Sequence, residues 1–319
     1  MSEQTSLWRE LVKAYAKGKF LIIVENNNDR RFYINMIDKF FKDTTSFYVR
    51  SISIFKNGTG GCGAIIKAIE EIQENLEKFP IFKNIFRGII DRDSFYYIAP
   101  KELIEKRNNL SGLFVLRYYS YESHLFTEKN ITKLLCYITN LTNEEIDDNT
   151  SHFLLKTIED KILHLLYYVG LECLRNAREK NYVAKFCYSD SETNIYPYSK
   201  LQNEVLNKLD KKYLDELAIN LGIHYDKETV KKIVKGKHIL YVLVKEFLFQ
   251  IQNIQNQCNE AETICRCLSN CDHIVCKWKS TARYETEHLC DMLKSYIDEV
   301  EVDYIAKELK KLNYNSNES

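Results

Sequence analysis

The chain has 319 residues, 45% of them hydrophobic, which is enough to bury a sizeable core in one large or two medium domains. Lysine plus arginine equals aspartate plus glutamate, at 45 each, and this balance excludes a global attraction to nucleic acid or to membranes. A polyanion would therefore have to bind at a local basic patch. With 3 prolines and 10 glycines, the composition favours a helix-rich protein.

The N-terminal residues show no charged segment followed by an apolar one, so no secretory signal is expected. We therefore predict a cytoplasmic protein whose 10 cysteines are mostly reduced thiols. No apolar run reaches the roughly 18 to 20 residues that span a bilayer, which predicts a soluble protein without a membrane contact.

Hydrophobic periodicity predicts alternating strands and helices in the first part of the chain. Strands are expected at 20–24, 47–55, 84–90 and 113–119, and helices at about 8–15, 29–41, 64–76 and 101–106. The first strand is short and apolar, the pattern of a parallel strand buried on both faces. Together these elements predict an α/β fold, a doubly wound and mostly parallel four-stranded sheet.

The strand signal fades after residue 127, and most of the remaining segments have helical periodicity. Helices are expected at 153–179, 229–254 and 285–312, with an ordered loop at 182–198. We predict an α/β core at 1–126, a helical insertion or second domain at 127–228, and a helical C-terminal region at 229–319.

Acidic residues follow three of the four predicted strands. Glu25 ends the first strand, Asp91 and Asp93 follow the third, and Glu122 follows the fourth, while Asp29 lies one turn beyond Glu25. Mg²⁺ and Mn²⁺ prefer oxygen ligands, and two-metal sites hold their ions roughly 3.5 to 4 Å apart. Clustered carboxylates also repel one another unless a cation neutralises them. The sequence therefore predicts a metal site, although each acid alone could be a helix cap or a turn residue.

The segments VENNNDRRFY and IIDRDSF resemble the Toprim domain, whose signature is a glutamate after the first strand and Asp-x-Asp after the third. Asn26 stands where that family usually has glycine. Together with RYYSYESHLF and KGKHIL, these segments look like the overcoming-lysogenization-defect (OLD) type of Toprim nuclease. Within that type they are most similar to the stand-alone Toprim effectors of PARIS-type anti-phage systems. The resemblance covers residues 18–125 and, more weakly, 229–245.

The resemblance implies a fold, an activity and a set of site residues. Two Mg²⁺ or Mn²⁺ ions would be bound or oriented by Glu25, Asp29, Asp91, Asp93, Ser120 and Glu122. Lys237, or Lys235 beside it, would return to the active site from the C-terminal region and stabilise charge on the phosphate. The implied reaction is phosphodiester cleavage of tRNA, triggered through a partner ATPase, with DNA as the other substrate and a homodimer as the implied assembly.

Other patterns leave alternatives open. Gly58, Gly60 and Gly63 fit G-x-G-x-x-G, but after the second strand rather than the first, so a tight turn or a phosphate-binding loop explains them better than a dinucleotide site. The residues Cys258 to Cys276 hold enough soft ligands for structural zinc, yet their spacing matches no C-x2-C pair, and free cysteines on a helix account for them better.

Two further functions compete with the nuclease. A Toprim scaffold could act as a non-catalytic module that docks an ATPase through its helical region, or the chain could be a topoisomerase- or primase-like enzyme lacking its companion domains. Lys237 has a plain alternative as an exposed lysine, because five lysines crowd residues 227–237. The same crowding is the best local basic patch for a nucleic-acid backbone.

Overall fold

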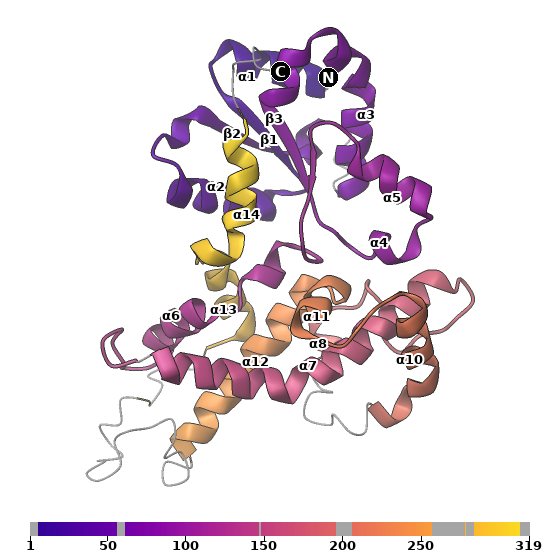
Figure 1. Ribbon diagram of the computed structural model, residues 1–319. Helices are drawn as coiled ribbons and strands as arrows, with labels where there is room; N and C mark the ends of the chain where they lie inside the picture. The colour runs from indigo at the N-terminus through magenta and orange to yellow at the C-terminus, as the bar shows by residue number, and fades with distance from the viewer. Residues whose placement is uncertain are drawn as a thin grey trace. The chain divides into compact units, whose positions relative to one another are not determined.

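The computed structural model describes residues 6–55, 61–146, 148–195, 206–256, 278 and 284–312. The chain forms two compact units (Figure 1). Unit 1 consists of Met1–Tyr121 with Glu299–Ser319, and unit 2 of Glu122–Asp298. This division differs from the predicted boundaries at 126 and 228. The last helix is grouped with the α/β core, and no boundary between the units falls near residue 228.

Unit 1 is built on a four-stranded sheet with the order β2-β1-β3-β4, and every neighbouring pair is parallel. The strands are β1 (Phe20–Val24), β2 (Phe47–Ser51), β3 (Phe86–Ile90) and β4 (Leu113–Val115). Leu21 to Val24 are all buried, as expected of a central parallel strand covered on both faces. The predicted α/β class with a parallel sheet and a large helical region is confirmed.

Helices cover both faces of this sheet (Figure 1). They are α1 (Leu7–Ala16), α2 (Asn27–Phe40), α3 (Cys62–Lys78), α4 (Phe95–Ile98), α5 (Lys101–Asn108) and α14 (Glu299–Lys310). Leu11 of α1 and Ile65 of α3 share a buried core with Leu21 of β1. On the opposite face α2 contacts β1 and β2, and α14 packs against α2. Unit 1 is therefore a doubly wound three-layer structure.

The second and fourth predicted strands end earlier than expected. After β2 the chain turns into a 3-10 helix, Ile52–Ile54, whose start is stabilised by the Ser51 hydroxyl accepting from the amide of Ser53. Beyond β4, the Arg117 amide donates to the hydroxyl of Tyr304 on α14. The Leu116 amide still donates to the Ile90 carbonyl of β3, so a side chain from the end of the sequence binds the edge of β4 that faces away from β3.

Unit 2 is helical. Its helices are α6 (Glu128–Ile138), α7 (Asp148–Arg178), α8 (Glu192–Ile195), α10 (Lys211–Asn220), α11 (Lys227–Ile233), α12 (Gly236–Asn256) and α13 (Thr286–Leu293). The long helix α7 packs against α6, α10, α11 and α12. A Cβ at Gly170 of α7 would lie 2.8 Å from side-chain carbons of Ile233 and Val234, so this glycine permits the close approach of α11.

Two predicted helices are each divided in the structure. The helix expected at 229–254 breaks at Val234, which is extended with φ −102° and ψ 135°. The helix expected at 285–312 ends at Leu293 and restarts at Glu299. Between these ends the Tyr296 carbonyl accepts a hydrogen bond from the buried amide of Asn130 on α6. Tertiary contacts therefore override a nearly continuous helical pattern.

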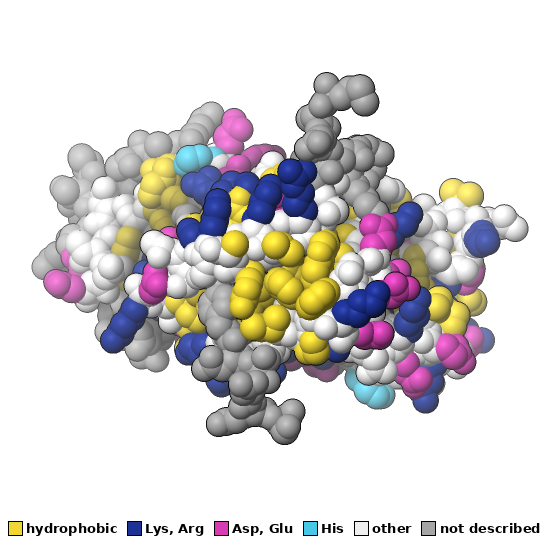
Figure 2. All heavy atoms as spheres, turned by 90° about the horizontal axis from the view of Figure 1, so that it is seen from above, with side chains coloured by type: hydrophobic (Ala, Val, Ile, Leu, Met, Phe, Trp, Pro, Cys, Tyr) yellow, Lys and Arg dark blue, Asp and Glu magenta, His cyan; other side chains and the backbone are white. Residues whose placement is uncertain are grey.

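The surface seen from above shows a group of hydrophobic side chains beside Lys and Arg side chains (Figure 2). In unit 1, the exposed apolar residues include Val12 and Tyr15 of α1 and Phe79. Trp8 and Tyr15 both pack edge-on against Phe82, with ring centroids 4.8 and 5.3 Å apart. No helix within the described residues is long and apolar enough to cross a membrane.

Candidate functional site

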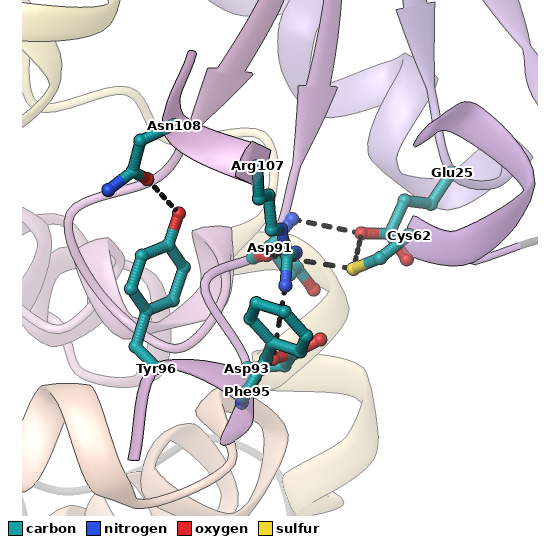
Figure 3. A network of polar contacts seen from close by, with 8 residues as sticks. All are labelled: Glu25, Cys62, Asp91, Asp93, Phe95, Tyr96, Arg107 and Asn108. Carbon is teal, nitrogen blue, oxygen red and sulfur yellow. Dashed lines mark hydrogen bonds and ion pairs between the residues drawn. The ribbon is translucent and has the colours of Figure 1, made fainter. Parts of the chain in front are cut away.

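The C-terminal edge of the sheet brings the acids after β1 and β3 into direct contact (Figure 3). Glu25 follows β1 and Asp91 follows β3, and these strands are paired neighbours. The Oε1 atom of Glu25 accepts a hydrogen bond of 2.9 Å from the Asp91 amide. Since parallel strands end at one edge, the convergence of Glu25 with Asp91 follows directly from the topology.

Cys62, at the start of α3, also forms a hydrogen bond with the Glu25 carboxylate. Its thiol donates to Glu25 Oε1 at 2.8 Å and lies 3.6 Å from the Asp91 carbonyl oxygen. Burial and the charge of Glu25 raise the pKa of the Cys62 thiol far above its usual value, so the sulfur remains a protonated donor. The other carboxylate oxygen of Glu25 has no hydrogen bond to a described residue.

The turn after β3 holds Asp93 in an unusual backbone conformation. Asp93 has a φ of 45°, and among the described residues it alone is a non-glycine residue with positive φ. Its Oδ1 accepts from the amide of Phe95 at 2.6 Å, while its own amide donates to the Tyr119 carbonyl. Aspartate tolerates this region because its short side chain bonds locally, and such strain is concentrated at functional sites.

Arg107 of α5 supplies positive charge beside the acids. Its side chain is buried and donates to the Asp91 carbonyl at 3.2 Å, with another guanidinium nitrogen 3.8 Å from Asp93 Oδ1. The guanidinium carbon also lies 4.5 Å from the ring centroid of Phe95. Arg107 therefore fixes the turn that carries Asp91 and Asp93.

Burial shapes the titration of these acids. It raises the pKa of Glu25, and the charge of Asp93 raises it further, against the hydrogen bonds from Cys62 and the Asp91 amide. Burial also raises the pKa of Asp93, although the Phe95 amide and Arg107 act in the opposite direction. The chain's own groups thus leave the negative charge at this edge incompletely compensated.

Asp29 belongs to the same acidic environment. It is buried in the first turn of α2, and the pKa of the buried Tyr33 is raised by burial first and then by the charges of Asp91 and Asp29. The helix is capped by Asn26, whose side chain accepts from the amides of Asn28 and Asp29, so Asp29 is not the cap. Asn26 is extended, with φ −149°, and this turn does not require the glycine that Toprim domains usually have there.

The remaining predicted site residues are Ser120, Glu122, Lys235 and Lys237. Ser120 is buried in unit 1 beyond β4. Glu122 belongs to unit 2, where it and Lys237 line one cavity of about 270 Å³ together with Glu192 and Lys294. Lys235 is also in unit 2, and its Nζ donates to the Tyr188 carbonyl at 3.0 Å. The structure therefore groups Glu25, Asp29, Asp91 and Asp93 in one unit and Glu122 with Lys237 in the other.

The donor set of unit 1 fits a hard divalent cation. Glu25, Asp91 and Asp93 offer only oxygen ligands, the type that Mg²⁺ and Mn²⁺ prefer. Burial raises the pKa of Glu25 and of Asp93, and a bound cation would offset this effect. In the part of the chain that the structure describes, no three His, Cys, Asp or Glu side chains are close enough to enclose an ion as they stand. Binding would therefore require the carboxylates to adjust.

Cys62 and Arg107 were not predicted as site residues. Cys62 lies in the glycine-rich turn that had been interpreted only through its glycines, and Arg107 lies in a short helix with a weak apolar pattern. Gly58, Gly60 and the residues Cys258 to Cys276 lie outside the described residues, so the zinc hypothesis stays a prediction. The five cysteines that are described, Cys62, Cys136, Cys173, Cys187 and Cys290, are all free.

Comparisons with known proteins extend this description no further. No protein-family model matches the chain, and no curated protein matches it.

Proposed function

We propose that the chain is a nuclease that cleaves nucleic-acid phosphodiesters with Mg²⁺ or Mn²⁺ at the carboxylates of unit 1. The observation that carries the proposal is the contact of Glu25 with the Asp91 turn at the C-terminal edge of a parallel sheet. Two partly buried carboxyls with raised pKa values lie at that edge, in a position where α/β proteins place their chemistry.

Each residue of the cluster has a separate role in this proposal. Glu25, Asp91 and Asp93 would bind the metal, and Asp29 would add negative charge behind them. The bound ion would supply an activated water and charge neutralisation at the phosphate. Cys62 and the Asp91 amide hold one oxygen of Glu25, which leaves its other oxygen for the ion. Arg107 is a positioning residue, because it holds the backbone of the Asp91 turn.

The resemblance to PARIS-type Toprim effectors supports the biological part of the proposal. Under it, the substrate is RNA, and tRNA in particular, with DNA as the alternative, and cleavage follows activation by a partner ATPase. Glu122 and Lys237 are assigned to substrate binding or catalysis, and they share a cavity of unit 2. Lys235 is the weaker candidate, because its ammonium group already donates to a backbone carbonyl.

A non-catalytic interaction module is the second candidate. It is favoured by the two hydrogen bonds that Glu25 Oε1 accepts, since they make the glutamate a brace between β1, β3 and the start of α3. In that case Glu25 would serve stability alone. The two functions differ in what a substitution at Glu25 changes, the cleavage rate or only the free energy of unfolding.

The proposal is tested by a cleavage assay with tRNA, total RNA, single-stranded DNA and plasmid, in Mg²⁺, Mn²⁺ or a chelator. We expect metal-dependent cleavage that falls at least about a hundredfold in Glu25→Gln, because an essential ligand is lost. Glu77→Gln makes the same chemical change on the exposed side of α3 and should keep full activity. Cleavage by Glu25→Gln at the rate of the unsubstituted chain, or equal cleavage in the chelator, would contradict the proposal.

A further inference from the structure

A basic cleft lies between α1 and β2 in unit 1, at the opposite end of β1 from Glu25. It has a volume of about 320 Å³, and its lining includes Glu10, Lys13, Lys17, Lys19, Tyr48 and Arg50. Lys19 immediately precedes β1, whereas Glu25 immediately follows it, so the full strand Phe20–Val24 separates the two sites. We propose that this cleft binds the phosphate group of a nucleotide.

The sequence places these side chains on one face by simple periodicity. Glu10, Lys13 and Lys17 are three and four residues apart along α1 and its C-terminal cap, so they project from the same side. Tyr48 and Arg50 are two apart on β2 and therefore point to one face of the sheet. Because β2 is an edge strand, α1 leaves part of that face open.

The cleft contains more positive charge than the chain itself neutralises. Glu10 is buried and pairs with Lys13 at 2.8 Å, while its other carboxylate oxygen is 3.9 Å from the Arg50 Nε. Lys17 and Lys19 form no ion pair with a described residue. With four cations and one carboxylate in the lining, an anion is the complementary ligand.

Arg50 provides an independent sign of a missing partner. Its guanidinium lies over the ring of Tyr48, with the central carbon 4.1 Å from the ring centroid. Its Nε is buried, and at 3.9 Å the Glu10 carboxylate is too far away to accept a hydrogen bond from it, so this donor has no hydrogen-bond partner. A buried donor without an acceptor is unfavourable, and a phosphate oxygen in the cleft would satisfy it.

The chemistry of the lining favours a phosphate ester of nucleotide size. Arginine offers a planar fork that matches phosphate oxygens, and lysines add point charges around it. The stacked Arg50 and Tyr48 form a flat surface on which a base could lie. The volume is at the lower end of the roughly 300 to 1,000 Å³ of small-molecule sites, which suits one nucleotide. That nucleotide could be free or part of an RNA strand, and the chemistry is the same for both.

The test measures binding to the full chain in a chelator, so that it does not depend on the proposed cleavage. The probes are inorganic phosphate, adenosine monophosphate and a fluorescent oligouridylate. The variant Lys17→Gln/Lys19→Gln removes two cations of the cleft. The control Lys39→Gln/Lys42→Gln removes two exposed lysines near the end of α2 and changes the net charge equally.

We expect the Lys17/Lys19 variant to bind at least about tenfold more weakly, because each charged contact is worth about that factor. The Lys39/Lys42 control should bind within about twofold of the unsubstituted chain. Lysine-dependent binding of adenosine monophosphate would identify a free nucleotide as ligand, and such binding of the oligouridylate alone would identify an RNA strand. Equal weakening in both variants, or no binding of any probe at millimolar concentration, would overturn the proposal.

Discussion

Glu25 shows how one side chain can join three elements of a sheet edge. One of its oxygens accepts from Cys62 at the start of α3 and from the Asp91 amide after β3, while the residue itself ends β1. Its position could be predicted, because an acid that ends a buried parallel strand has only one edge of the sheet to occupy. The Cys62 contact could not be predicted, since a thiol beside a carboxylate has no periodic signature in sequence.

Asp93 also illustrates a limit of sequence analysis. In an extended chain, the Asp91-x-Asp93 spacing would put both side chains on one face. The positive φ of Asp93 instead turns the chain so that its carboxylate accepts from the Phe95 amide. Arg107, which comes from a helix later in the chain, also donates to the Asp91 carbonyl of this turn.

His238 gives a prediction about acid stability. It is buried in unit 2, where its Nε2 lies 2.9 Å from the Asp190 carbonyl. Burial lowers the pKa of His238, and the charge of Lys235 lowers it further. The hydrogen bond to Asp190 and the charge of Glu192 act in the opposite direction. The unfolded pKa is about 6.5, so the unfolded chain takes up the proton first as pH falls. The contribution of the neutral imidazole to the free energy of unfolding is therefore complete above about pH 6.5. It is lost as the pH falls from there through the lower pKa that His238 has in the folded chain.

We expect the free energy of unfolding to decrease between about pH 7.5 and pH 5.5, and to decrease less in His238→Gln, which keeps a donor for Asp190 but cannot titrate. Urea unfolding at the two pH values measures both. The control His288→Gln changes a more exposed histidine. An equal pH dependence in the His238 variant and the unsubstituted chain would be incompatible with this account.

At the scale of elements, the type of most helices and strands could be predicted, and their ends could not. The strand β4 ends at Val115, and two residues later the Arg117 amide donates to Tyr304 of α14. The helix α12 begins anew at Gly236 because Val234 is extended. Both features depend on packing between segments that are distant in sequence. The helix α2 begins at Asn27, two residues before the predicted start at 29, because Asn26 rather than Asp29 is its N-cap.

The packing of α3 on β3 yields a prediction at this scale. Gly88 of β3 has no room for a side chain, because a Cβ there would lie 2.7 Å from a side-chain carbon of Ile65 and 2.8 Å from one of Ile69. We expect Gly88→Ala to lower the free energy of unfolding by about 1 to 3 kcal/mol through overpacking. Denaturant unfolding measures the change.

The matched control is Gly63→Ala in α3 itself, where no atom lies within 4 Å of the added methyl group. Alanine is the better helix former, so this variant should be unchanged or more stable by up to about 1 kcal/mol. If both variants lose the same stability, the close contact between α3 and β3 does not explain the need for glycine at position 88.

At the scale of the molecule, the α/β class was predictable and the division into units was not. The last helix, α14, belongs with the sheet, where Glu308 pairs with Arg87 of β3 at 2.8 Å across 221 residues of sequence. Both side chains are largely buried, and such a pair is costly to break on one side. A helical pattern from 285 to 312 gives no sign that its two halves lie in different units.

The residues of the predicted site belong to both units. The sequence placed Glu25, Asp91, Asp93, Glu122 and Lys237 in one constellation, because strand ends and a distant lysine can meet in a parallel fold. The structure groups the first three within unit 1 and the last two within unit 2. The central claim of the account therefore rests on the acids of unit 1.

That claim is tested most directly by titrating the full, metal-free chain with Mn²⁺ in a calorimeter. The account predicts saturable binding to the unsubstituted chain and to Glu77→Gln, and binding at least about tenfold weaker in Glu25→Gln, because a direct carboxylate ligand is removed. Mn²⁺ binding of equal affinity in all three proteins, or no binding to any of them, would contradict it.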